Sequence, residues 1–237
     1  MKNKKAIIIH SGGMDSSLCL AIAIAEHGKE NVLSLSFKYS QRHQNELIQA
    51  QKISNYFQVD HVVLDLSLMG EITKNALVDS SVSIEHPENQ SPNTLVVGRN
   101  GLMMRVAAIY GFNLGVLELY VGVMELEVAN SGYRDCSRKY VDLIEATLRL
   151  DLNNEKFSIK TPLVFLTKKE TMELAFKMGV LNFLLEETIT CYEGIIKFGC
   201  GKCPACLLRN QGIGDFLKDH PSFDFSYKNE IVSAHNS

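Results

Sequence analysis

A glycine-rich turn between an apolar run and a helix-like stretch constrains this chain more than any other feature. Residues 5–10 form a short apolar run typical of a buried parallel strand, and residues 11–13 read Ser-Gly-Gly. Apolar residues then recur with helical spacing over 15–27. Glycines let the backbone approach a ligand closely, and the unpaired N–H groups in a helix's first turn favour an anion. We interpret the turn as a phosphate-binding loop, although a tight turn capped by serine or aspartate is the plainer alternative.

Further apolar runs alternate with helix-like stretches along the chain. The expected strands cover residues 32–37, 61–66 and 117–123, and the expected helices cover 43–57, a stretch after Arg99, 140–148 and 168–178. Strands that alternate with helices predict an α/β fold, a parallel sheet with helices on both faces. Residues 74–95 interrupt this pattern with polar, proline-containing sequence, which is typical of a lid, a binding loop or a disordered segment.

Length and charge restrict the function classes. At 237 residues the chain fits one α/β domain with at most a small appendage. Its net charge of -3 gives no overall attraction to nucleic acid or to an anionic membrane, so neither is expected as a partner. The apolar run at 6–9 is too short for a signal peptide, and no later stretch is long enough to span a bilayer. We therefore expect a cytoplasmic protein.

Four of the six cysteines lie within one short segment. They are Cys191, Cys200, Cys203 and Cys206, with glycines and a proline between them that permit tight turns. In a reducing compartment such a cluster indicates a metal more often than disulfides. Four thiolates suit a closed, tetrahedral structural Zn²⁺ site, although an iron–sulfur cluster also uses four cysteines. We expect a main domain over 1–186 and a zinc-binding segment over 187–237 that packs on it.

The whole loop reads S-G-G-x-D-S-S and resembles the signature of PP-loop ATP pyrophosphatases. It is not a Walker A loop, because no Gly-Lys-Ser or Gly-Lys-Thr closes it. Enzymes of this adenine nucleotide alpha-hydrolase-like Rossmann type split ATP between the α and β phosphates and leave AMP on the substrate. The resemblance implies that the pyrophosphate end of ATP is bound by Ser11, Gly12, Gly13, Asp15, Ser16 and Ser17. Asp15 is also the candidate for placing Mg²⁺, although it could equally cap its helix.

Short strings between Ala6 and about Leu217 resemble those of one PP-loop family. Tyr-Ser-Gln-Arg-His at 39–43 is similar to its Y-G-Q-R-H, Gly-Arg-Asn at 98–100 to its P-G-R-N, and Ser-Gly-Tyr-Arg-Asp-Cys at 131–136 to its S-G-Y-P-D-C. Thr-Pro-Leu at 161–163, Lys168 with Glu170, Thr-Cys-Tyr at 190–192 and the cysteine segment complete the resemblance. Each string is weak alone, but in this order and spacing they resemble the QueC family, the 7-cyano-7-deazaguanine synthases.

The resemblance implies a two-stage reaction driven by ATP. The carboxylate of 7-carboxy-7-deazaguanine attacks the α-phosphate, pyrophosphate leaves, and ammonia displaces AMP to give an amide. A second adenylation, on the amide oxygen, leads to the nitrile. The candidate catalytic residues are Arg99, Lys168 and Asp15, of which the two cations can neutralise phosphate charge. The candidates for substrate contact are Tyr133, Asp135, Arg42 and His43, with Arg42 also a third candidate cation. Members of the family are usually homodimers, so we expect a homodimer.

The chain departs from the family pattern around the expected substrate pocket. Val97 and Arg134 stand where the family has proline, Met103 replaces an aromatic residue, and 124–130 is slightly longer. These departures leave a second hypothesis open, a QueC-like paralogue of bacterial antiviral operons. Such an enzyme would join the activated acid to another amine, for example one on a partner protein, or would stop at the amide.

Two further classes fit the sequence less well. A tRNA-thiolating enzyme would need reactive cysteines or an iron–sulfur cluster, and usually a basic RNA-binding face. A zinc-stabilised binding module would leave the S-G-G-x-D-S-S loop unexplained.

Overall fold

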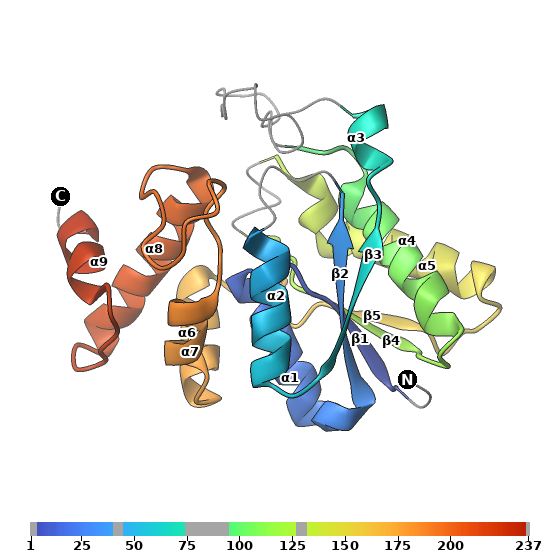
Figure 1. Cartoon of the computed structure of the whole chain (residues 1–237), viewed down its shortest axis with the longest axis horizontal. Helices are drawn as coiled ribbons and strands as arrows, with labels where there is room; N and C mark the ends of the chain where they lie inside the picture. The colour runs from blue at the N-terminus through green and yellow to red at the C-terminus, as the bar shows by residue number, and fades with distance from the viewer. Residues whose placement is uncertain (1–3, 40–44, 74–94, 127–131, 236–237) are drawn as a thin grey trace.

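The computed structural model describes residues 4–39, 45–73, 95–126 and 132–235. In this part of the chain five parallel strands form one sheet in the order β3-β2-β1-β4-β5 (Figure 1). The strands are β1 (Ala6–Ile9), β2 (Val32–Lys38), β3 (Asp60–Asp65), β4 (Glu118–Val121) and β5 (Ser158–Lys160). The strand order reverses between β1 and β4. Open α/β sheets bind their ligands beyond the carboxyl ends of the strands at such a point.

Helices cover both faces of the sheet. The α-helices are α1 (Met14–His27), α2 (Asn45–Tyr56), α3 (Met69–Ile72), α4 (Arg99–Phe112), α5 (Arg138–Asp151), α6 (Lys168–Lys177), α7 (Leu181–Glu187), α8 (Pro204–Asp219) and α9 (Lys228–His235), with short 3₁₀ helices at Lys29–Asn31 and Arg134–Cys136. Successive side chains of a strand point to opposite faces. Ile8 of β1 therefore packs in one core with Leu18 of α1, while Ile7 packs in a second core with Met104 of α4 and Val141 of α5. The predicted α/β fold is confirmed.

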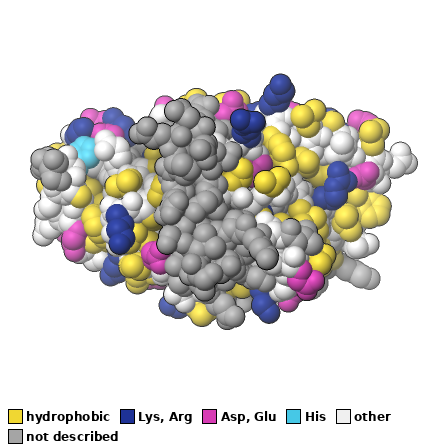
Figure 2. Space-filling view, turned by 90° about the horizontal axis from the view of Figure 1, so that it is seen from above, with side chains coloured by type: hydrophobic (Ala, Val, Ile, Leu, Met, Phe, Trp, Pro, Cys, Tyr) yellow, Lys and Arg dark blue, Asp and Glu magenta, His cyan; other side chains and the backbone are white. Residues whose placement is uncertain are grey.

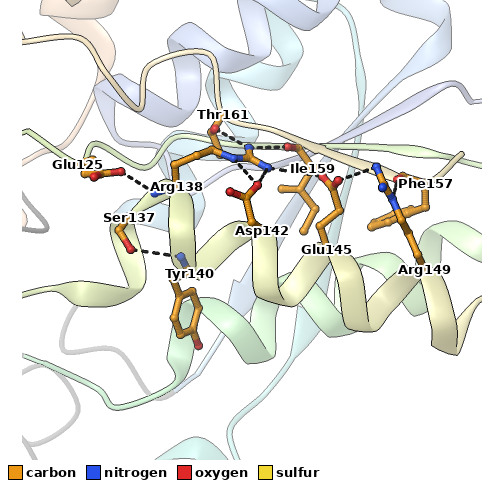
Figure 3. Close-up of polar contacts among 10 residues, drawn as sticks. All are labelled: Glu125, Ser137, Arg138, Tyr140, Asp142, Glu145, Arg149, Phe157, Ile159 and Thr161. Atoms are coloured by element: carbon orange, nitrogen blue, oxygen red, sulfur yellow. Dashed lines mark hydrogen bonds and ion pairs between the residues drawn. The ribbon is translucent and has the colours of Figure 1, made fainter. Parts of the chain in front are cut away.

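Polar side chains of α5 complete the backbone hydrogen bonding of the edge strand β5 (Figure 3). The Glu145 carboxylate accepts a hydrogen bond from the Ile159 N–H at 2.6 Å, and Arg138 Nη1 donates to the Ile159 carbonyl at 3.0 Å. Arg149 forms an ion pair with Glu145 at 2.6 Å. Because an edge strand otherwise leaves backbone groups unpaired, these contacts hold a three-residue strand in place.

The C-terminal helices share a hydrophobic core with the sheet. Met172 of α6, Leu184 of α7 and Phe216 of α8 belong to the same buried cluster as Leu18 of α1. In Figure 1 these helices lie on the side of α1 and α2, away from α4 and α5. The core thus continues from the sheet into the helix that follows the cysteine segment, and the division at residue 187 stays a prediction.

The strands and helices expected from sequence agree with the structure, with their ends shifted by up to three residues. The sequence analysis did not identify β5, α3, α7, α8 or α9. The expected loop at 74–95 lies outside the described residues except for Leu95. Among the helices that the structure describes, none combines the length and the apolar character needed to cross a membrane.

Candidate active site and metal centre

The predicted phosphate loop joins β1 to α1 at the carboxyl edge of the sheet. Ser11 Oγ accepts a hydrogen bond from the Gly13 N–H at 3.3 Å and lies 3.1 Å from Ser16 Oγ. The hydroxyls of Ser16 and Ser17 donate to the Gly13 carbonyl at 3.1 Å and 2.7 Å. The loop is therefore held by its own hydroxyls, and no described side chain caps the start of α1 at Gly13. An uncapped helix start is suited to bind an anion.

Two glycines let neighbouring elements approach the loop closely. Gly12 has a φ of +78°, and a Cβ built there would lie 2.5 Å from the Glu46 carbonyl oxygen at the start of α2. A Cβ at Gly122, just after β4, would lie 2.8 Å from the Ser16 amide nitrogen. Both distances are shorter than a real side chain tolerates, so both positions require glycine. The loop is thus enclosed between α2 and the end of β4.

His10 lies beneath the loop with both ring nitrogens hydrogen-bonded. Its Nδ1 lies 2.9 Å from Ser34 Oγ and its Nε2 lies 3.0 Å from Ser17 Oγ. Burial, and secondarily the charge of nearby His61, lowers the pKa of His10 to about 3. The imidazole is therefore neutral at physiological pH and ties the loop to β2 without adding charge to the site.

Lys168 and Asp15 form an ion pair beside the loop. Lys168 Nζ lies 2.6 Å from each carboxylate oxygen of Asp15, and the lysine side chain is only 6% exposed. Lys168 is the first residue of α6, whose start is fixed by reciprocal hydrogen bonds between Thr167 and Glu170. A Cβ at Gly212 of α8 would lie 2.4 Å from Lys168 Cβ, so α8 packs directly on this lysine. The structure therefore brings together two of the three predicted catalytic residues.

Two cavities meet at the loop. One has a volume of about 300 Å³ and extends over the strand ends to Phe37 and Met103. The other has a volume of about 480 Å³ and extends to Lys168 and to Leu208 of α8. Both are lined by Ser11, Ser16, Glu46, Arg99, Gly122, Tyr133 and Tyr192, which we call the shared wall. Two molecules bound in the two cavities would meet there.

Arg99, the third predicted catalytic residue, belongs to the shared wall. Its Nη1 donates to the Tyr39 hydroxyl at 3.4 Å, and its guanidinium carbon lies 5.6 Å from the centre of that ring. Burial raises the pKa of neighbouring Glu46 to about 7, and the Arg99 charge only partly opposes this. The shared wall thus combines a permanent positive charge with a carboxyl group that titrates near neutral pH.

The predicted substrate residues are brought together only in part. Tyr133 belongs to the shared wall. Asp135 is buried and is not among the residues that line either cavity. Burial raises its pKa, and the charge of Arg99 and the Asn100 N–H oppose this rise. Its carboxylate accepts a hydrogen bond from the Asn100 N–H in the first turn of α4, so its charge can stabilise that helix end. Arg42 and His43 lie outside the described residues.

Cys136 lines the smaller cavity next to Asn100, whose Nδ2 lies 3.6 Å from its sulfur. Burial, and secondarily the negative charge of Asp135, raises the pKa of Cys136 to about 12. The side chain is therefore a neutral thiol at physiological pH and not an activated nucleophile.

The four clustered cysteines converge on one point. The sulfur atoms of Cys191, Cys200, Cys203 and Cys206 all lie within 4.8 Å of one another. A tetrahedral Zn²⁺ with Zn–S bonds near 2.3 Å would place its ligands about 3.8 Å apart, and the Cys200 and Cys206 sulfurs are 4.0 Å apart. The residues present therefore fit a metal bound by four thiolates.

The backbone around the four sulfurs also fits such a metal. The Cys203 N–H donates to the Cys200 sulfur at 3.3 Å, as N–H groups around thiolate ligands commonly do. Gly199 has a φ of +72°, and a Cβ there would lie 2.4 Å from the Cys206 sulfur, so only glycine leaves room for the cluster.

A buried guanidinium lies next to this cluster. Arg209 is 2% exposed, and its Nε and Nη2 donate to the Asn210 side-chain oxygen at 3.0 Å and 2.8 Å. No ion pair joins Arg209 to a described carboxylate, while its charge acts on the sulfur of Cys206. A buried cation needs a compensating anion. A metal bound by four thiolates would provide one.

Sequence reasoning missed three residues around the shared wall. Tyr39 and Tyr192 belong to strings that resemble the QueC family, so a signal for them existed. The Tyr192 hydroxyl lies 3.3 Å from that of Tyr133, which links the cysteine segment to the active-site wall. Glu46 had no comparable signal, since its role depends on how the start of α2 meets the loop.

A family model described as queuosine biosynthesis protein QueC matches residues 5–217 of this chain. The match covers the phosphate loop, Arg99, Lys168 and all four clustered cysteines. It therefore extends over nearly all of the described site.

Solved structures show a similar fold at low sequence identity. A 4-thiouridine synthetase, solved in complex with RNA and with bound ATP, is 16% identical with a TM-score of 0.52. That alignment covers 99% of this chain but only 54% of the synthetase, so this chain spans about half of that protein. At this identity the likeness supports the fold alone.

Two further structures resemble the chain more loosely. The U34-tRNA thiolase NcsA of Methanococcus maripaludis, solved with its 4Fe-4S cluster, is 19% identical with a TM-score of 0.47, over 100% of this chain and 72% of the thiolase. The NH3-dependent NAD synthetase of Campylobacter jejuni is 14% identical with a TM-score of 0.46, over 100% of this chain and 86% of the synthetase. Similarity at this level carries no argument about the function or the metal of this chain.

Proposed function

The chain belongs to the QueC family, and from this premise we propose that it is an ATP-dependent carbon–nitrogen ligase that adenylates 7-carboxy-7-deazaguanine. Pyrophosphate and AMP are released, ammonia forms the amide, and a second adenylation leads to the nitrile, 7-cyano-7-deazaguanine. The observation that carries the proposal is the meeting of two cavities at the phosphate loop, with Arg99 on their shared wall and Lys168 in the larger one. This arrangement suits a reaction between ATP and a second bound molecule.

Adenylation requires charge neutralisation and alignment, and no nucleophile from the protein. In the proposed complex, the first-turn N–H groups of α1 and the hydroxyls of Ser11 and Ser16 hold the pyrophosphate end of ATP. Arg99 and Lys168 neutralise the charge that develops on the phosphates as the carboxylate oxygen attacks. Mg²⁺ bound with ATP supplies further neutralisation, and Asp15, which lines the larger cavity, is the carboxylate that would hold it.

We also propose that the four cysteines hold a structural Zn²⁺. Zn²⁺ with four thiolates carries a net charge of about -2, which the buried Arg209 would partly balance. The metal would fix Tyr192, which directly follows Cys191, and the start of α8, which directly follows Cys203. Its role is therefore to hold one side of the shared wall. Metal analysis of the purified protein separates zinc from an iron–sulfur cluster, because the latter contains iron and inorganic sulfide.

The proposed setting is a homodimer in the reducing cytoplasm. The outer surfaces of α4 and α5 expose Ile109, Phe112, Leu143 and Leu150, each at least 53% accessible. Figure 2 shows hydrophobic side chains gathered at the right of the molecule, the side on which α4 and α5 lie in Figure 1. An apolar surface of this kind is typical of a protein–protein interface. Light scattering on the purified protein tests the dimer.

The paralogue hypothesis depends on departures from the family pattern, and the structure locates three of them. Met103 lines the smaller cavity. Val97 is 83% exposed and Arg134 is also exposed, and neither is among the residues that line a cavity. Of these three departures, Met103 alone lines a cavity. The departures therefore give only weak support to an altered acceptor, and the synthase reaction is our primary proposal.

Mass spectrometry of the reaction products tests the proposal. The purified protein is incubated with 7-carboxy-7-deazaguanine, ATP, Mg²⁺ and ammonium. Nitrile with AMP and pyrophosphate is the expected result. AMP with amide alone would support the paralogue that stops at the amide, and AMP with neither amide nor nitrile would support one that uses another amine. If no AMP forms, the substrate assignment is wrong.

A further inference from the structure

The shared wall contains few groups that can exchange a proton at physiological pH. Among its described members, the serine hydroxyls and Arg99 do not titrate near neutrality, and burial raises the pKa of Tyr192 above its ordinary value. Elsewhere in the smaller cavity, His10 is neutral with both nitrogens occupied, and Cys136 is a neutral thiol. In the larger cavity, both oxygens of Asp15 pair with Lys168. Of the described residues in the two cavities, this leaves Glu46 as the candidate for accepting a proton near neutral pH.

The fold fixes Glu46 next to the phosphate loop. It is the second residue of α2, and its carbonyl oxygen would lie 2.5 Å from a Cβ at Gly12. Its side chain is half-buried and lines both cavities. Among the described residues, the charged and titratable groups that face it are Arg99 and Tyr39, and no hydrogen bond or ion pair holds its carboxyl group. Glu46 therefore lies at the place where two bound molecules would meet.

We propose that Glu46 is the general base of the amidation step and accepts a proton from the attacking nitrogen. The inference rests on the proposed function and adds to it the residue that activates the amine. At neutral pH ammonia is present mainly as ammonium, which has no lone pair for attack. A carboxylate at the junction of the cavities can both attract this cation and remove its proton.

The amidation step moves two protons and exchanges one bond at the acyl carbon. Ammonium transfers one proton to the Glu46 carboxylate and becomes ammonia. The ammonia lone pair forms the C–N bond at the acyl carbon, and the C–O bond to the phosphate breaks, so AMP leaves with the electron pair. The nitrogen then loses a second proton to solvent and the neutral amide remains. Glu46 releases its proton to solvent before the next turnover.

The ionisation of Glu46 suits this role. A general base works best when its pKa lies near the operating pH, and burial raises the pKa of Glu46 to about 7. The opposing charge of Arg99 is already part of this balance, so about half of the Glu46 side chains are carboxylates at pH ~7. Below neutrality Glu46 is protonated and cannot accept a proton.

Hydroxylamine provides a probe that separates this role from others. It is largely unprotonated at neutral pH, so it attacks an acyl adenylate without help from a base and gives a hydroxamate. The full-length protein is supplied with 7-carboxy-7-deazaguanine, ATP and Mg²⁺, and with either ammonium or hydroxylamine. Pyrophosphate exchange into ATP, measured without amine, reports adenylation alone. Glu46→Gln is compared with Glu155→Gln, which removes an exposed carboxylate from the turn after α5.

In Glu46→Gln we expect the ratio of amide to hydroxamate formation to fall by about 10²-fold or more, the usual contribution of a general base. The wild-type amidation rate should level off above about pH 7, where Glu46 is ionised. The variant's rate should continue to rise with the concentration of free ammonia. Glu155→Gln should match the wild type in both respects.

Three outcomes would overturn the inference. An unchanged ratio in Glu46→Gln would show that Glu46 does not activate ammonia. Loss of the plateau above about pH 7 in His43→Gln but not in Glu46→Gln would assign the base to that histidine. Loss of exchange, amide and hydroxamate together in Glu46→Gln would give the residue a role in adenylation or folding. If the wild type shows no exchange, the proposed function itself fails, and the inference fails with it.

Discussion

The contact between Gly212 and Lys168 predicts that adding one methyl group on α8 will disable a site formed largely by other elements. A Cβ at Gly212 would lie 2.4 Å from Lys168 Cβ and 3.0 Å from its backbone carbonyl carbon. Ordinary contacts begin at 3.4 Å, so α8 and the start of α6 must separate by about 1 Å. A shift of this size at a positioning residue can reduce the rate about 10²-fold. Gly212→Ala should therefore reduce pyrophosphate exchange to roughly that extent.

The effect on stability should be smaller than the effect on activity. Overpacking costs about 1–3 kcal/mol, while replacing glycine by alanine inside a helix regains about 1 kcal/mol. The net loss is therefore about 0–2 kcal/mol. Gly214→Ala is the matched control on the same helix, because its Cβ would meet His235, a side chain of α9 that can move aside. We expect the control to keep wild-type exchange activity.

Exchange assays and thermal melts on both variants check the prediction. Wild-type exchange activity in Gly212→Ala would refute the reasoning that α8 positions Lys168. Equal losses in the two variants would also contradict it, since only one of them contacts the lysine.

Three further predictions concern the metal centre and the buried histidine. Cys203→Ser should lose bound zinc, and emission spectroscopy of the purified protein should then show well under one metal per chain. Arg209→Met should weaken zinc binding by about 10–100-fold in a competition assay with a chelator, whereas Arg209→Lys should retain more affinity because it keeps the positive charge. Because the pKa of His10 is about 3 when folded and near its ordinary 6.5 when unfolded, the unfolded state binds more protons below pH 6.5. Stability should therefore fall by about 1.4 kcal/mol between about pH 7.5 and about pH 5.5. Urea unfolding of His10→Gln should lack this decrease.

Features of the site that depend on local sequence were predictable. The phosphate loop follows the first strand, and its glycines, serines and aspartate stand next to one another in the chain. The four cysteines lie within one segment, and their sulfurs do converge. In both cases the chain geometry leaves little freedom, so residue type and spacing carry most of the information.

Other features depend on contacts between distant segments and could not be predicted. β5 was missed because its residues are of mixed polarity, and it is held at the sheet edge by Glu145 and Arg138 of α5. Gly212 shows no functional signal in the sequence, since its importance comes from the approach of α8 to Lys168. Asp135 meets the first turn of α4, a contact between distant segments that its own string did not reveal, and its contact with substrate stays a prediction.

The most direct test of the central claim follows an oxygen atom from the acid to AMP. The substrate carboxylate is labelled with heavy oxygen, and the full-length protein is supplied with ATP, Mg²⁺ and ammonium. If the carboxylate attacks the α-phosphate, mass spectrometry should find one labelled oxygen in the AMP. Unlabelled AMP, or ADP as the nucleotide product, would contradict adenylation of the carboxylate.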